Sequence, residues 1–209
     1  MKRIAPLLAL SLVLAGCKAN MLDIDISQFS RLPSLEDLDY SRVSPAARYE
    51  YWELRWTFGG GEGNRILGAG GLRPRSQLDP TIIAELDSTL PPSGFFSGCL
   101  PAYCYTFIAA VNGSVQVYAN RPTLLQFLGQ IDSMEEAALV AHTYNLHWSS
   151  SDTSTGYRAV SAGWEILALQ LVRDCTPVQT DRVLVLVRRD GSLVELGREV
   201  HSRSENACV

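Results

Sequence analysis

A β-hairpin pattern centred on Asn112-Gly113 constrains the fold of this chain more than any other feature. Runs rich in β-branched and aromatic residues, 105–111 and 114–119, lie on either side of it. Asn-Gly supplies the positive φ angles that a type I′ turn requires, so this stretch predicts two antiparallel strands. A two-residue turn would place Ile108 opposite Val117.

Two helices are predicted directly after this hairpin. Residues 122–128 are typical of a short helix that ends at Gly129, and Ser133 and Glu136 form a Ser-x-x-Glu capping box. The box predicts a second helix that continues to about residue 146. Its apolar residues recur at i, i+3, i+4 and i+7: Ala137, Val140, Ala141 and Tyr144. This spacing predicts that one face of the helix packs on a sheet.

The segment 52–58 alternates apolar and polar residues. The apolar set is Trp52, Leu54, Trp56 and Phe58, and the polar set is Glu53, Arg55 and Thr57. A period of two predicts a strand with one buried face. The two tryptophans favour core packing over a carbohydrate or lipid platform, because alternation is what a buried sheet face requires.

The last third of the chain predicts strands. Residues 164–173 are apolar on both faces, which is typical of a central strand, and Val160 belongs to another short strand. A second hairpin spans 183–200 around Asp190-Gly191. A two-residue turn there gives this register: Val187 opposite Val194, Val185 opposite Leu196 and Arg182 opposite Glu199.

These elements define the expected fold class. Asp79-Pro80 begins one further short helix, since Asp79 can cap it and proline suits its first position. We therefore predict an α+β fold: a mainly antiparallel sheet, built from two β-hairpins and a central strand, packed against two helices.

The N-terminus has the features of an export signal. Lys2 and Arg3 precede the apolar run 4–14, which is shorter than the roughly 20 residues that span a bilayer. The sequence Leu-Ala-Gly-Cys17 follows and resembles the lipobox of bacterial lipoproteins. The resemblance implies a signal peptide over 1–16 and a lipidated N-terminus and tether over 17–40. The alternative is an ordinary signal peptide cleaved nearby, with Cys17 a stray thiol. The length of the remaining chain predicts a single domain over 41–209, with two small lobes as the alternative.

The lipobox implies a place in the cell. The protein would contact the lipid bilayer through acylated Cys17, in the bacterial cell envelope. Lys18 stands where an aspartate retains the resembled lipoproteins at the inner membrane, so its presence favours the outer membrane, facing the periplasm. Loss of Lys2 and Arg3 changes the net charge from −4 to about −6, which gives no electrostatic reason to bind nucleic acid. The sequence names no protein partner in the envelope.

The remaining cysteines are Cys99, Cys104, Cys175 and Cys208. An even number in an exported chain indicates two disulfides. Cys175 leaves the central strand and Cys208 follows the last strand, so that pair would pin the C-terminus, and Cys99–Cys104 would close a small loop. Loop closure favours this pairing over the other connectivities.

No motif in the sequence names a reaction, a cofactor or a metal site. His142 and His147 are five residues apart, about 140° around a helix, so they do not share a face as a zinc pair would. The glycine run 59–63 lacks the spacing of a P-loop. Glu135 and Glu136 suit the helix start, and Asp132 and Asp152 could act as acid and base only if the fold brings them together. The hydroxyl-rich stretch Ser149–Gly156 is expected to be a solvated connection, and a binding loop is the alternative.

Part of the chain resembles an uncharacterised group of bacterial lipoproteins. The similarity covers about residues 99–209 and rests on the stretch Phe127–Ala137, the turn Asp174-Cys-Thr-Pro177, the Asp190-Gly191 hairpin and Arg198-Glu-Val200. These motifs are structural, a capped helix, turns and a disulfide end, so the resemblance implies no activity.

Two functions follow as hypotheses. The first is a non-enzymatic lipoprotein that binds or scaffolds something at the envelope membrane, and the second is a hydrolase acting on cell-envelope material. An enzyme predicts a polar cleft in which ionisable groups such as His142, His147 and Asp132 converge. A binding protein predicts an exposed apolar patch or groove.

Overall fold

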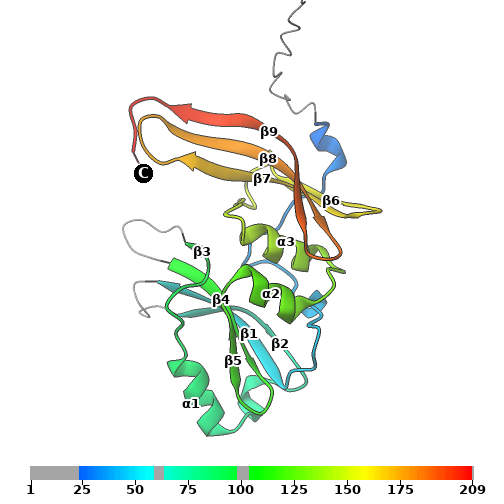
Figure 1. The fold of residues 1–209 in the computed structure, drawn as a ribbon, viewed down its shortest axis with the longest axis vertical. Coiled ribbons are helices and arrows are strands. Elements are labelled where there is room, and N and C mark those ends of the chain that lie inside the picture. Colours follow the sequence, from blue (N-terminus) through cyan, green and yellow to red (C-terminus); the bar gives the residue numbers. More distant parts are fainter. Residues whose placement is uncertain (1–23, 59–63, 98–103, 209) are drawn as a thin grey trace, which may run out of the picture.

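The computed structural model describes residues 24–58, 64–97 and 104–208. Within these residues the chain forms two antiparallel sheets and three α-helices (Figure 1). The helices are α1 (Pro80–Ser88), α2 (Arg121–Leu128) and α3 (Met134–His142). The predicted α+β class is confirmed, but the single sheet is wrong. Sequence patterns show which strands form a hairpin and not which hairpins share a sheet, and the two hairpins lie in different sheets.

The first sheet has five described strands. They are β1 (Tyr51–Phe58), β2 (Arg65–Gly70), β3 (Phe95–Ser97), β4 (Cys104–Val111) and β5 (Val115–Tyr118). The order is β2-β1-β4-β3, and β5 also pairs with β4. The strand predicted over 52–58 is thus β1, at the centre of this sheet.

The second sheet has four described strands in sequence order. They are β6 (Gly156–Val160), β7 (Gly163–Arg173), β8 (Val178–Arg188) and β9 (Leu193–Ser204). The predicted central strand is β7, which pairs with β6 and β8. Strands β7 to β9 run past the helices at one end (Figure 1).

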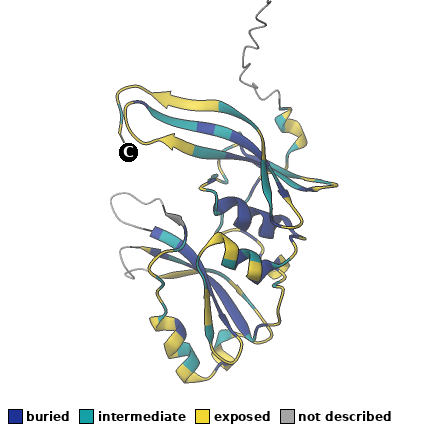
Figure 2. Cartoon of the chain, viewed as in Figure 1, coloured by how far each residue is buried: buried dark blue, intermediate teal, exposed yellow. Residues whose placement is uncertain are grey.

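The helices α2 and α3 lie between the two sheets (Figure 1). One core therefore contains residues of both sheets, such as Trp52 and Ile108 of the first and Ile166 and Val185 of the second. Every residue of α3 is buried, which corrects the prediction of one packed face (Figure 2). A sheet on each side leaves no face of this helix in water.

The capping box of α3 is confirmed and extended. Ser133 Oγ accepts from the Glu136 amide at 3.2 Å, and Glu136 Oε2 accepts from the Ser133 amide at 3.1 Å. The Glu136 carboxylate, fully buried, also accepts from the amides of Asp132 and Ser44, each at 2.7 Å. It thus ties the start of α3 to the segment before β1.

Both hairpins form, but the predicted registers are wrong near the turns. In the first, Ile108 pairs with Tyr118 rather than Val117, because Ser114 joins the turn as a third residue. In the second, Val187 pairs with Leu193 rather than Val194, and Val185 with Glu195 rather than Leu196. Register shifts in β8–β9 then restore the expected pair of Arg182 with Glu199, which form an ion pair.

The polar side chains of β1 are buried, contrary to the prediction of one buried face. Glu53, Arg55 and Thr57 are 0%, 3% and 1% exposed. They lie on the face of the sheet that carries a second apolar cluster, which includes Phe107 of β4 and Leu86 of α1. Because α1 covers this face, the polar positions of β1 lie in the interior, where Arg55 donates to Glu53 at 2.6 Å.

The segment before β1 belongs partly to the fold. Leu32, Leu38 and Tyr40 are buried in the main core, and Ser30 forms an antiparallel bridge with Tyr157 of β6. Residues 30–40, which we expected in the tether, therefore pack with the domain. Cys17 and the predicted signal peptide lie outside the described residues.

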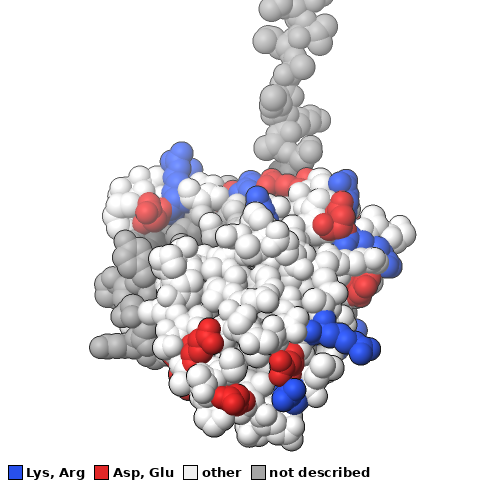
Figure 3. Space-filling view, turned by 60° about the horizontal axis from the view of Figure 1, so that its bottom comes forward, with Lys and Arg blue, Asp and Glu red and all other residues white. Residues whose placement is uncertain are grey.

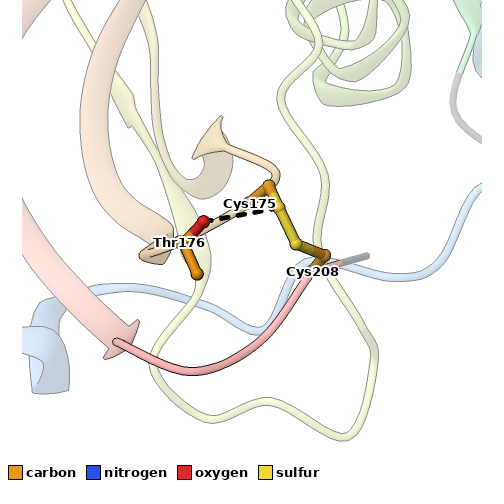
Figure 4. Close-up of a disulfide and its surroundings, with 3 residues drawn as sticks. All are labelled: Cys175, Thr176 and Cys208. Carbon is orange, nitrogen blue, oxygen red and sulfur yellow. Dashed lines mark hydrogen bonds between the residues drawn. A yellow bond between two sulfur atoms is a disulfide. The ribbon is translucent and has the colours of Figure 1, made fainter.

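A disulfide joins Cys175, after β7, to Cys208, after β9 (Figure 4). The pairing predicted from loop closure is thus present, and it fixes the C-terminal segment beside the turn between β7 and β8. Cys99 lies outside the described residues, whereas Cys104 is fully buried at the start of β4.

No helix of the described chain is long and apolar enough to cross a membrane. On the face shown in Figure 3, acidic and basic side chains lie around an uncharged centre. Neither sign of charge forms a continuous patch on that face.

Candidate functional site

A pocket of about 380 Å³ lies between the first sheet and the end of α3, where the chain crosses toward the second sheet. Strands β1, β2 and β4 provide one side, and the end of α3 with the segment after it provides the other. Residues 34–36, before β1, complete the wall. We call it the junction pocket.

The apolar walls of the junction pocket are Leu35, Trp56, Leu67 and Trp148. The indole Nε1–H of Trp148 donates to the Pro33 carbonyl at 2.7 Å, which fixes the orientation of this ring. The ring of Trp56 stacks on Phe58, with centroids 5.7 Å apart and planes 16° apart. Both tryptophans are half-buried, so each presents part of its ring to the pocket.

The two tryptophans of β1 have different surroundings. Trp52 is 2% exposed and packs edge-on against Tyr40 and Phe127 in the core. Trp56 lies on the same face of β1, four residues further along the strand, and lines the junction pocket. Core packing is therefore right for Trp52 and incomplete for Trp56.

Leu67 enters the pocket at a register shift in β2. Leu54 pairs with Gly68 and Arg55 with Ile66, which leaves Leu67 as an extra residue on this strand. A β-bulge of this kind redirects a side chain, and bulges are frequent beside functional sites. The alternation pattern of the sequence gives no sign of it.

His142 and His147 both line the junction pocket. Burial lowers the pKa of His142 to about 4, against a weaker opposing effect of a backbone hydrogen bond with Leu146. Burial also lowers the pKa of His147. His147 is held by two backbone hydrogen bonds to Leu169 of β7, at 2.9 and 2.8 Å. The bend after α3 therefore brings together two histidines that a continuous helix would separate.

The other polar residues of the pocket are Ser34, Glu36, Arg65 and Thr106. The Ser34 hydroxyl donates to Asp37 at 2.5 Å, and the Thr106 hydroxyl donates to the Phe95 carbonyl at 2.8 Å. Glu36 and Arg65 form an ion pair in which both side chains are more than half exposed. They therefore present a donor and an acceptor group to water at the edge of the pocket.

The remaining candidate residues lie elsewhere. Asp132 accepts from Gln130 at 2.9 Å and lies 3.5 Å from Arg189, and Asp152 accepts from the Ser154 amide at 2.7 Å. Neither aspartate lines the junction pocket. Among the described residues, no group of histidine, cysteine and carboxylate side chains could hold a metal ion.

The sequence did not single out Glu36, Arg65, Leu67 or Trp148. The sequence predicts that Glu36 belongs to the tether, and Trp148 lies in a stretch whose apolar residues show neither helical nor strand periodicity. None of these four residues carries a sequence signal, because single apolar or charged residues in loops and strands are common at protein surfaces.

The comparisons with known proteins give no family for this chain: no family model, no curated protein and no solved structure matches it. The resemblance to a group of bacterial lipoproteins therefore stays a prediction.

Proposed function

We propose that this protein is an envelope lipoprotein, anchored by acylated Cys17 at the outer membrane, that binds a small ligand in the junction pocket without transforming it. The observation that carries this proposal is the pocket itself: about 380 Å³, with two half-buried tryptophans as walls. Sites for small molecules are typically concave, largely apolar, of about 300 to 1,000 Å³, and supplied with a few polar groups.

The polar groups of the pocket suit recognition better than catalysis. The Ser34 hydroxyl donates its hydrogen bond to Asp37, and the Thr106 hydroxyl donates its hydrogen bond to the Phe95 carbonyl. A histidine with a pKa of about 4, such as His142, is a weak base, and general-base catalysis needs a pKa near the working pH. Glu36 is paired with Arg65. These groups can hold a ligand, and they do not form a nucleophile with its base.

A hydrolase acting on envelope material is the second candidate. It is favoured by the convergence of His142 and His147 in one pocket, two of the three ionisable groups expected to meet in an enzyme, whereas Asp132 lies elsewhere. The test is release of soluble fragments from isolated envelopes by the purified lipoprotein. Binding without chemistry predicts equal release by the wild type and a His147→Ala variant, whereas a hydrolase predicts release that the variant loses.

The binding role is tested by filling the pocket. Leu67→Trp should occupy the space beside Trp56, and Ile66→Trp is the matched control, because Ile66 is the neighbouring residue of β2, is 44% exposed and does not line the pocket. Each lipoprotein is incubated with a small-molecule extract of envelopes, recovered, and examined by mass spectrometry. A compound retained by the wild type and by Ile66→Trp, and lost from Leu67→Trp, supports the proposal. Equal retention by both variants contradicts it.

The anchor is tested separately with a fatty-acid analogue. Cys17→Ser should abolish labelling of the chain and release it from the membrane fraction. Labelling and fractionation that are unchanged in Cys17→Ser would refute the lipid anchor and leave the pocket untouched.

A further inference from the structure

The junction pocket has a chemistry that selects among small ligands. Its two tryptophan walls are flat, and Trp56 stacks on Phe58, which lies outside the pocket and is 37% exposed. Phe58 therefore supports one side of the Trp56 ring and extends the apolar surface beyond the pocket. An aromatic ring supported in this way suits a ligand with a flat apolar face.

Hydrogen-bond donors and acceptors both lie beside the Trp56 ring. Glu36 accepts hydrogen bonds and Arg65 donates them, and their charges cancel in the ion pair. Burial lowers the pKa of His147, against a smaller opposing effect of a backbone hydrogen bond with Asn145, so this ring adds no fixed charge to that of the ion pair. The pocket thus offers mixed donors and acceptors with no excess charge, which gives a phosphate or a carboxylate no electrostatic advantage.

We infer that the junction pocket binds a hexopyranose ring, with the C–H face of the sugar stacked on Trp56 and adjacent hydroxyls bonded to Glu36 and Arg65. This inference rests on the proposed binding function and adds the ligand class. A pyranose has an apolar face formed by axial C–H groups and a rim of hydroxyls that both donate and accept. An acyl chain, in contrast, has no hydrogen-bonding groups along its length, so it would leave Glu36 and Arg65 without a role.

The sugar has two sources in an envelope, a structural glycan or a diffusible saccharide. The probes are therefore a β-1,4-linked N-acetylglucosamine disaccharide, which represents the glycan, and maltose, which represents the diffusible sugar; laurate is the acyl comparison. The lipidated protein is held in phospholipid nanodiscs, and binding is followed by calorimetry and by saturation-transfer NMR.

The expected result is binding of at least one disaccharide with a dissociation constant of about 1 mM or tighter. The strongest NMR transfer should fall on the ring C–H protons of the stacked face. Trp56→Ala should weaken binding about tenfold or more, and Trp56→Phe should restore part of it. Glu36→Ala and Arg65→Ala are more than half exposed, so both variants should fold and should also weaken binding, whereas Leu72→Ala, at a residue 68% exposed and outside the pocket, should not.

The two proposals fail in different ways. If neither disaccharide binds at about 10 mM while Leu67→Trp still loses a retained compound, the sugar inference is wrong and the binding function stands. Saturable binding of laurate that Leu67→Trp abolishes has the same meaning. Disaccharide binding that Trp56→Ala and Arg65→Ala leave unchanged also overturns the inference, because the sugar then binds elsewhere.

Discussion

The buried ion pair of Glu53 and Arg55 should contribute strongly to the free energy of folding, and this contribution can be predicted in magnitude. Glu53 is fully buried and accepts from Arg55 Nε at 2.6 Å and from the Tyr51 hydroxyl at 2.8 Å. Arg55 is 3% exposed, and its next carboxylate, Asp87, lies 3.7 Å away and is 62% exposed. Glu53→Ala therefore leaves a buried guanidinium with one distant partner.

Removing one partner of a buried pair costs about 3 to 5 kcal/mol of folding free energy. Asp87 offsets only part of the charge on Arg55, because it also pairs with Arg75 at 2.5 Å, so we expect a cost of at least about 3 kcal/mol. At a urea dependence of about 2 kcal/mol per molar, the unfolding midpoint should fall by at least about 1.5 M. The measurement is equilibrium urea unfolding, followed by tryptophan fluorescence and by circular dichroism.

Two variants control this prediction. Glu36→Ala breaks the exposed pair with Arg65, and its cost should stay within about 0.5 kcal/mol. The double variant Glu53→Leu/Arg55→Met replaces the buried pair by apolar groups and should regain most of the lost stability. A cost below about 1 kcal/mol for Glu53→Ala, equal to that of Glu36→Ala, would refute the assignment of this pair to the interior.

Three further outcomes follow from other contacts. Ser133→Ala removes the cap of α3 and should destabilise the fold by about 1 kcal/mol in the same urea assay; no change would mean that Glu136 alone holds the helix start. The pKa of His142 is lowered to about 4 from 6.5, so its contribution to stability is complete above pH 6.5 and is lost as the pH falls toward 4. Between pH 7 and pH 5 this loss should be about 2 kcal/mol, and His142→Phe should remove that part of the pH dependence; an NMR titration with an ordinary pKa would contradict it. Replacing Cys175 and Cys208 by serine opens a loop with a sequence separation of 33 and should cost at most about 4 kcal/mol; a Tm unchanged by reducing agent would show that the hairpin needs no cross-link.

Local structure followed from the sequence wherever a specific residue determines it. Asn112-Gly113 gave a hairpin, Ser133 with Glu136 gave a helix start, and Asp79 caps α1 through the Thr81 amide at 2.8 Å. These features depend on a few neighbouring residues, so a single sequence contains the information. Registers failed by one residue, because a turn with one more residue, such as the turn that takes in Ser114, changes little in the sequence and shifts the pairs beyond it. In β8–β9 a later register shift restores the expected pairing.

The arrangement of the sheets could not be read from the sequence in the same way. Alternation in β1 predicts one solvent-exposed face, but α1 covers the face that carries Glu53 and Arg55. No local sequence pattern shows which helix will cover which face of a sheet. The junction pocket has the same origin. Trp56 and Leu67 come from two paired strands of the first sheet, whereas His147 comes from a segment much later in the chain, after the end of α3, so the three meet only in the folded protein.

Ligand retention by the pocket-filling pair tests the central claim most directly. Wild-type lipoprotein and the Ile66→Trp variant should retain the same small molecule from an envelope extract and return it unchanged in mass, while Leu67→Trp should retain none. Retention by Leu67→Trp equal to that of Ile66→Trp, or recovery of the molecule only as cleaved products, would contradict the account.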